Sequence, residues 1–340
     1  MNDTFFIVGL TAVGKSELAA EVAARLGAEI VNADAFQIYE GFDVLTGKPD
    51  LRTLGKAPHH LIGTISPTEE MNAAKYRSLS LRLIADITSR GKMALVVGGS
   101  GLYVKALTHG LVNAPPADRR LRQQLNELSI DDLCARLTTL DPAAAETIDT
   151  KNRRRVVRAI EIALISGQPA SAQRMQWDHP RSGDLQIAEL TDSRRSAASA
   201  ELRRAKGDRR SLTHAAETSV THDGVFVFRD RSDLYERINR RVEVMLQNGA
   251  IDEVREAGEV NQTVEQMIGI REIRKYLGGE ISQGECLTKI QQSTRRYAKR
   301  QLTWFRRQTN FELLNLSLLS HDEAVEWVLR RALARRAADD

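Results

Sequence analysis

The first third of the chain alternates short apolar runs with amphipathic stretches. Residues 5–8, 29–33 and 93–97 are mainly apolar and are bounded by polar and glycine residues, which predicts buried strands. Residues 17–26 and 76–90 repeat apolar positions at helical spacing, so each is predicted to form a helix. Strands that alternate with helices in this way indicate a parallel α/β sheet with right-handed crossovers.

The pattern changes in the middle of the chain, where residues 115–181 show no strand signal. Residues 117–140 and 141–166 have the apolar spacing of helices. The segment 184–223 includes a long stretch almost free of large apolar side chains, which is typical of a solvated helix or a mobile segment.

A further apolar run, residues 225–228, predicts one more strand, and helical patterns follow it to the end of the chain. We therefore expect an α/β domain formed by residues 1–114 and 224–340. The helical residues 115–183 would be an insertion into it, joined through the polar segment 184–223.

Composition excludes several classes of protein. The chain has 340 residues, of which 42% are hydrophobic, so it can bury a sizeable core. Its mean hydropathy of −0.35 and the lack of a long uncharged apolar run exclude a membrane span. Cys134 and Cys286 have no metal-binding spacing, so we expect a reducing, cytoplasmic environment and no zinc module. The start of the chain, with Asp3 and no cationic region, predicts no signal peptide.

Residues 9–16 match the phosphate-loop pattern G-x-x-x-x-G-K-[ST] through Gly9, Gly14, Lys15 and Ser16. The loop lies between a predicted strand and a predicted helix, which is the context that the motif requires. Backbone N–H groups and the helix N-terminus would hold phosphate, while the lysine adds charge and the serine a ligand for Mg²⁺. A glycine-rich turn that matches by chance is the weaker explanation. The motif indicates a phosphate compound without identifying it.

The acid that a P-loop ATPase usually places at a second strand end is missing from the strand 93–97, which runs into Gly98-Gly99-Ser100-Gly101. Asp34 follows the strand 29–33, and we expect it near the phosphate because neighbouring parallel strands end at the same edge. It could bind metal, accept a proton from an acceptor group, or simply cap a loop. The glycine-rich turn allows either close approach of a ligand to Ser100 or tight helix–strand packing.

Two stretches are strongly basic. Residues 151–158 contain five cations, and residues 295–307 contain six and no acid. The second stretch follows a capping box, Ser282 and Glu285, and its helical spacing separates the cations from an apolar and aromatic side. Solvated surface is the ordinary explanation of such a face, but two acid-free clusters favour a polyanion. Structured RNA fits better than duplex DNA, and the aromatic residues are expected to pack in the core.

In order along the chain, several blocks together resemble the tRNA dimethylallyltransferase family. These blocks are residues 9–16, 32–39, 58–61, 98–103, 154–161, 234–238 and 294–304. The resemblance covers about residues 5–307, and the ordered set is far more specific than any single motif. It implies a P-loop NTPase-like sheet with a helical insertion domain that grips the anticodon stem-loop.

The resemblance also implies an activity: transfer of a dimethylallyl group from dimethylallyl diphosphate to N6 of the adenosine 3′ of the anticodon, in tRNAs reading codons that begin with U. Diphosphate would leave, with Mg²⁺ held at Ser16 and no ATP hydrolysed. The implied diphosphate-binding residues are Gly9, Thr11, Ala12, Val13, Gly14, Lys15 and Ser16. Asp34 would be the general base, Ser100 would contact the flipped base, and Arg231 would neutralise the leaving group.

The implied tRNA contacts lie in the same blocks. They are Asp34, Ala35, Phe36, Gln37, Ser100, Arg154, Arg155, Val156, Val157, Arg158, Arg295, Arg296, Lys299 and Arg300. The C-terminal zinc module of eukaryotic members is absent, so we expect an enzyme of the bacterial type. We also expect a monomer. Leu10, Val13, Ser16, Ala35 and Ser100 depart from the usual family residues; the two serines keep the hydroxyl of a threonine, whereas Val13 removes one.

Two other classes of function remain open on the sequence alone. A P-loop kinase of small molecules would use Asp34 to activate a hydroxyl group towards ATP, and would leave the basic helix without a role. A non-catalytic RNA-binding protein with a relict phosphate loop would be indifferent to loss of Asp34. Adenylate-type isopentenyltransferases share the early motifs but need no long basic C-terminal helix.

Overall fold

The fold is described from a computed structural model covering residues 3–111, 115–175, 223–308 and 311–339. The chain divides into two compact units. The first comprises Met1–Thr108 and Gln186–Asp340, and the second His109–Leu185. The division falls at residue 108, whereas the sequence placed it at 114. Most of the polar segment predicted at 184–223 lies outside the described residues.

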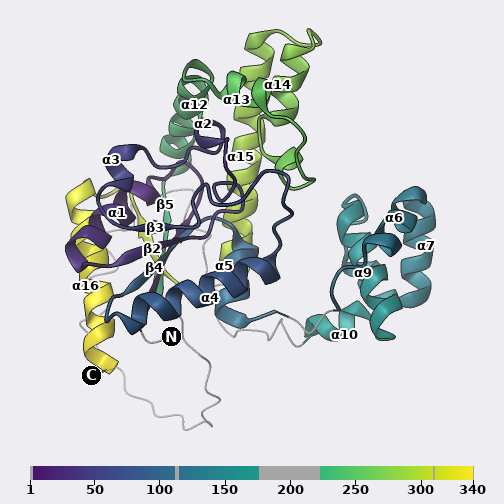
Figure 1. The fold of residues 1–340 in the computed structure, drawn as a ribbon, viewed down its shortest axis with the longest axis horizontal. Coiled ribbons are helices and arrows are strands. Elements are labelled where there is room, and N and C mark those ends of the chain that lie inside the picture. Colours follow the sequence, from purple (N-terminus) through teal and green to yellow (C-terminus); the bar gives the residue numbers. More distant parts are fainter. Residues whose placement is uncertain (1–2, 112–114, 176–222, 309–310, 340) are drawn as a thin grey trace, which may run out of the picture. The chain divides into compact units, whose positions relative to one another are not determined.

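The first unit is built on a six-stranded sheet with the order β3-β2-β4-β1-β5-β6, in which every neighbouring pair is parallel (Figure 1). The strands are β1 (Thr4–Gly9), β2 (Glu29–Asn32), β3 (His59–His60), β4 (Ala94–Gly98), β5 (Gly224–Phe228) and β6 (Glu312–Asn315). The four strands predicted from apolar runs are confirmed. The two edge strands were missed, because β3 has only two residues and β6 lies where helices were expected.

The helices of the first unit lie on both sides of the sheet and at its carboxyl edge. They are α1 (Lys15–Leu26), α2 (Asp43–Thr46), α3 (Leu51–Leu54), α4 (Ala73–Ser89), α5 (Gly101–His109), α12 (Arg231–Gln247), α13 (Ala250–Glu256), η2 (Val264–Gln266), α14 (Ile270–Leu277), α15 (Gln283–Gln308) and α16 (His321–Asp339). The predicted capping box begins α15: the Ser282 amide donates to Glu285, whose own amide donates to the Ser282 hydroxyl. Within the described residues, none of the helices is long and apolar enough to cross a bilayer.

Strand β4 lies between β1 and β2, so the expectation that the strands before and after α1 are neighbours is wrong. Their ends still come close, because Gly98 at the end of β4 has no side chain. A Cβ atom at Gly98 would lie 2.2 Å from the carbonyl oxygen of Ala33. The absence of that atom lets the loop after β2 approach the centre of the sheet, where the phosphate loop begins.

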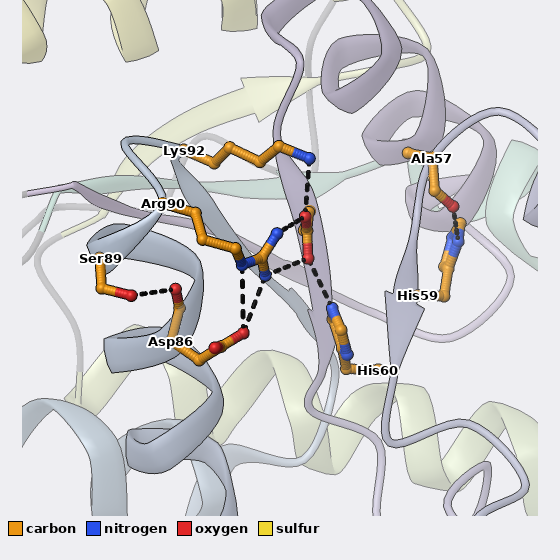
Figure 2. Close-up of polar contacts among 8 residues, drawn as sticks. Ala57, His59, His60, Asp86, Ser89, Arg90 and Lys92 are labelled. Atoms are coloured by element: carbon orange, nitrogen blue, oxygen red, sulfur yellow. Dashed lines mark hydrogen bonds and ion pairs between the residues drawn. The ribbon is translucent and has the colours of Figure 1, made fainter.

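The amino end of β2 is fixed by a buried carboxylate, that of Glu29. Figure 2 shows its partners Arg90, Lys92 and His60. Glu29 is 3% exposed and accepts hydrogen bonds from Arg90 at 2.5 and 2.9 Å, from Lys92 at 2.9 Å, and contacts His60 at 2.9 Å. The pKa of Glu29 lies far below its usual range, chiefly because of the hydrogen bonds from Arg90. Burial acts in the opposite direction, and the contacts with Lys92 and His60 lower the pKa further. The cluster ties β2, β3 and the segment after α4 together, and so fixes the strand that leads to Asp34.

The second unit is helical and has a core of its own. Its helices are α6 (Arg119–Glu127), α7 (Ile130–Leu140), α8 (Pro142–Thr147), α9 (Arg153–Ser166) and α10 (Ala170–Met175). Each of the two long helices predicted here is in fact a pair. A capping side chain marks the start of three of these helices: Ser129 for α7, Asp141 for α8 and Asn152 for α9. Each of these side chains accepts a hydrogen bond from a backbone N–H group of its helix. These capping signals were present in the sequence.

Candidate active site

A cavity of about 790 Å³ opens at the carboxyl edge of the sheet in the first unit. The phosphate loop, the loop after β2 and the helix α12 line it, together with Lys48, Asp50 and His59. Carboxyl edges of parallel sheets are the usual place for ligands in α/β proteins, because loops from several strands converge there.

The phosphate loop is held open by arginines from a distant part of the chain. Ala12 and Gly14 have φ angles of 63° and 100°, and the loop runs directly into α1. Arg237 donates to the carbonyl oxygen of Ala12 at 2.9 Å, and Arg229 donates to that of Val13 at 2.9 Å. With these carbonyl groups engaged, the N–H groups at the start of α1 are left to bind an anion.

Two cations face the cavity beside one carboxylate. Lys15 donates to the carbonyl oxygen of Leu10, and Arg241 donates to that of Thr46 at 2.9 Å. Burial lowers the pKa of Lys15 to about 8; nearby Asp34 opposes this shift and Arg241 adds to it. Burial also lowers the pKa of Arg241, again against the attraction of Asp34. A bound polyanion would relieve this crowding of positive charge.

Asp34 uses one carboxylate oxygen for structure and presents the other. Its Oδ1 accepts from the amides of Phe36 and Gln37 at 2.9 and 3.4 Å, the local turn that aspartate favours. In the described parts of the chain, no residue donates a hydrogen bond to Oδ2. The Asp34 amide is in turn held by the Asn32 side chain at 3.2 Å. Asp34 is therefore a loop acid and a candidate base at once.

A second, smaller cavity of about 60 Å³ meets the first at the four residues that line both, Thr11, Asp34, Thr46 and Arg241. The rest of its lining is mainly apolar: Phe36, Leu45, Val242, Met245, Met267, Ile268 and Ile290, with Thr294 and Tyr297. A charged cavity and an apolar one thus share the same carboxylate.

Not every residue predicted to bind diphosphate lies at the cavity. Thr11, Ala12, Gly14, Lys15 and Ser16 line it. Gly9 does not; it ends β1, where a Cβ atom would lie 2.1 Å from the carbonyl oxygen of Val227. The side chain of Val13 is fully buried in the core, so the family hydroxyl that it replaces has no counterpart at the cavity.

Arg231, expected to neutralise the leaving group, is not placed at the cavity. It is the exposed first residue of α12 and lies over the ring of Tyr235, 5.1 Å from its centre. Arg237, Arg240 and Arg241, two to three turns further along α12, line the cavity instead. Sequence reasoning missed them, although their spacing places all three on neighbouring positions of one helix face.

A hydrogen bond joins the loop after β2 to the glycine-rich turn. The Ser100 hydroxyl accepts from the Ala35 amide at 2.8 Å, and Ser100 lines neither cavity. Phe36 lines the small cavity, and Gln37 lines the large one while donating to the Gly47 carbonyl at 2.8 Å. Cβ atoms at Gly99 and Gly101 would each lie 2.4 Å from side chains of α15. These two glycines therefore serve tight packing, one of the two alternatives that the sequence left open.

The predicted basic face of α15 is largely exposed. Arg296, Lys299 and Arg300 lie on the surface. Arg295 differs, since it donates to Asn239 at 2.6 Å and lies over the ring of Tyr235. On the other side Ile290, Ala298 and Phe305 are buried, and Trp304 packs against the core. The prediction that the aromatic residues pack in the core is therefore confirmed for Trp304 and Phe305, whereas Tyr297 lines the small cavity.

The basic segment of the second unit is split between surface and core. Arg154 and Arg155 are exposed at the start of α9. Val156 and Val157, predicted among the tRNA contacts, are instead buried in the core of this unit. Arg158 pairs with the fully buried Glu161 at 2.5 Å and donates to the Pro115 carbonyl at 2.7 Å.

A parallel sheet whose central strand runs into a phosphate loop and a helix defines a P-loop α/β protein. Comparison with known proteins narrows the class. The IPP transferase family model matches residues 37–197 and 186–308. A tRNA dimethylallyltransferase of Geobacter metallireducens is 39% identical over 310 residues, which are 88% of each chain. The chain belongs to the IPP transferase family, whose members include the tRNA dimethylallyltransferases.

Further relatives agree with this assignment. The tRNA dimethylallyltransferase 1 of Citrifermentans bemidjiense is 38% identical over 87% of each chain. Among solved structures, the full-length tRNA isopentenylpyrophosphate transferase of Bacillus halodurans aligns with a TM-score of 0.64 at 29% identity, covering 100% of this chain and 99% of that one. A eukaryotic dimethylallyltransferase acting on tRNA shares the fold, with a TM-score of 0.67 at 23% identity over 92% of this chain and 74% of that one.

Proposed function

We propose that this protein transfers a dimethylallyl group from dimethylallyl diphosphate to the N6 amine of an adenosine in tRNA. The target is the adenosine 3′ of the anticodon, in tRNAs that read codons beginning with U. The observation that carries the proposal is the junction of two cavities at Asp34: one is cationic and suits a diphosphate, and the other is small and apolar and suits a five-carbon chain.

In this reaction a C–N bond forms between N6 and the allylic carbon, and the bond from that carbon to the diphosphate oxygen breaks. Oδ2 of Asp34 takes the proton that the amine loses. Lys15 and Arg241 stabilise the negative charge that grows on the departing diphosphate, together with the N–H groups at the start of α1. Fixing these groups beforehand avoids reorganisation during the reaction.

The donor set at the cavity fits Mg²⁺. Ser16 offers a hydroxyl oxygen, and no cluster of three His, Cys, Asp or Glu side chains that could hold a metal occurs among the described residues. Mg²⁺ commonly keeps several waters and binds through substrate phosphates with one or two protein oxygens, so Ser16 would hold it. When bound, the ion would neutralise part of the diphosphate charge.

RNA binding is assigned to exposed cations. Arg296, Lys299 and Arg300 on α15, and Arg154 and Arg155 on α9, have exposed side chains, whereas Arg295 and Arg158 contact residues of their own units. Extruding the target base costs a few kcal/mol, which phosphate contacts and the pocket repay. We propose that the protein works in the cytoplasm as a monomer.

The test is transfer of label from dimethylallyl diphosphate to bulk tRNA with Mg²⁺, with parallel reactions that add ATP or omit tRNA. We expect label in tRNA whether or not ATP is present. Turnover of ATP without labelled tRNA would instead support a P-loop kinase and reject the proposal.

A further inference from the structure

Gln301 of α15 joins the phosphate loop to the glycine-rich turn after β4. Its side chain is 5% exposed, and both ends of its amide group are used. Oε1 accepts from the amide N–H of Thr11 at 2.9 Å, across 290 residues of sequence, and Nε2 donates to the Gly99 carbonyl at 2.9 Å. A buried amide satisfied in both directions fixes the distance between the two loops.

The turn is shaped to receive this helix. A Cβ atom at Gly99 would lie 2.4 Å from Nε2 of Gln301, and one at Gly101 would lie 2.4 Å from the ring of Trp304. One helical turn before Gln301, the side chain of Tyr297 interacts with both Ser100 and Gln301. Ser100 in turn accepts from the Ala35 amide, next to Asp34. Helix α15 thus reaches both loops that define the proposed reaction site.

The bond to Thr11 also decides which group of that residue faces the cavity. Because its N–H group is already paired with Gln301, the Thr11 amide is not available to phosphate. The Thr11 hydroxyl accepts a hydrogen bond from Nη1 of Arg241 at 3.4 Å, and its own hydrogen can still be donated to a phosphate. Loss of the Gln301 side chain would leave the partly buried N–H group of Thr11 without its partner at the beginning of the loop.

We propose that Gln301 is a positioning residue that couples RNA binding on the exposed face of α15 to diphosphate binding in the phosphate loop. Lys299 and Arg300 directly precede Gln301, on the turn of α15 that holds both loops. RNA phosphates bound to these cations restrain that turn, so bound tRNA raises the affinity for diphosphate, and diphosphate raises the affinity for tRNA by the same factor. The inference rests on the proposed function for its choice of ligands.

The test measures the affinity of the full chain for Mg²⁺-pyrophosphate by titration calorimetry, with and without an unmodified tRNA transcript that reads codons beginning with U. In the wild type we expect tRNA to tighten pyrophosphate binding several-fold. In Gln301→Leu we expect pyrophosphate to bind about tenfold more weakly, because the phosphate loop loses its hydrogen bond to α15, and we expect tRNA to have no further effect. The matched control is Gln283→Leu, the same substitution at an exposed position of the same helix.

A second variant, Gln301→Glu, keeps the acceptor for Thr11 and loses the donor to Gly99, so it carries the test even if the leucine variant does not fold. We expect it to keep most of the pyrophosphate affinity and to lose most of the coupling. A wild type without coupling, or a folded Gln301 variant with wild-type affinity and coupling, overturns the inference. Pyrophosphate does not react, so this experiment tests the coupling without the prenyl transfer. If the proposed prenyl transfer is wrong, the wild-type protein will still bind both ligands but will not label tRNA.

Discussion

The cations beside the cavity and the cations along α15 are chemically alike but held in different ways. Lys15 and Arg241 each donate to a backbone carbonyl, and burial lowers their pKa values. Arg296, Lys299 and Arg300 lie in solvent. Fixed and partly desolvated charges recognise a small anion through geometry and resist screening, whereas exposed charges act through counterion release and weaken with salt. If the proposed function is correct, the two groups of cations form two anion sites with separate physical signatures.

The largest effect should come from the carboxylate shared by the two cavities. Replacing Asp34 by Ala removes the proposed base, so turnover should fall by about 10² to 10⁴, while tRNA affinity changes little. Single-turnover label transfer and filter binding would measure the two quantities. A comparable loss of tRNA affinity would instead make Asp34 an RNA contact.

The second largest loss of activity is expected from a change at Arg241. Changing Arg241 to Met removes a fixed charge from the leaving-group side, so kcat/KM for dimethylallyl diphosphate should fall by about 10²- to 10³-fold. The dependence of tRNA binding on salt should stay as in the wild type. Arg231→Met is the matched control on the same helix, and activity near wild type there would agree with its place outside the cavity. The reverse ranking of the two variants would contradict this assignment.

The exposed cations should show the opposite behaviour. In the double variant Arg296→Gln and Arg300→Gln, tRNA affinity should fall by about tenfold at moderate salt, and the slope of log affinity against log salt should become shallower by about 1 to 2. Pyrophosphate affinity without tRNA should not change. Lys289→Gln, an exposed position nearer the start of α15, is the control. Unchanged tRNA binding over a range of salt would make this face ordinary solvated surface.

The smallest expected effect is the uptake of a fraction of a proton by Lys15 when an anion binds in the cavity. Its pKa is lowered to about 8, so the positive charge is complete below that pH and is lost as pH rises through it. A bound anion favours the charged form, and binding above pH 8 should therefore take up a fraction of a proton that binding at pH 6.5 does not. Calorimetry in two buffers of different ionisation enthalpy measures this uptake. Lys15→Met should abolish the difference; the same uptake in that variant would assign it to another group.

Much of this protein follows from its sequence because the signals are local. The phosphate loop, the four inner strands and the capping box of α15 each depend on residues a few positions apart, so pattern and spacing predict them. The position of Asp34 beside the loop was also predicted, but for the wrong reason: β4 separates β1 from β2, and it is the missing side chain of Gly98 that lets the two ends approach.

Only the tertiary structure decided which arginines face the cavity and which glutamine joins the phosphate loop to the glycine-rich turn. Arg231 and Arg241 lie on the same helix, and its packing against α15 leaves one of them in solvent and the other at the cavity. Gln301 meets Thr11 across 290 residues, a contact that no local pattern encodes. Local sequence fixes which elements form and where they begin, but contacts between distant residues are set by how those elements pack.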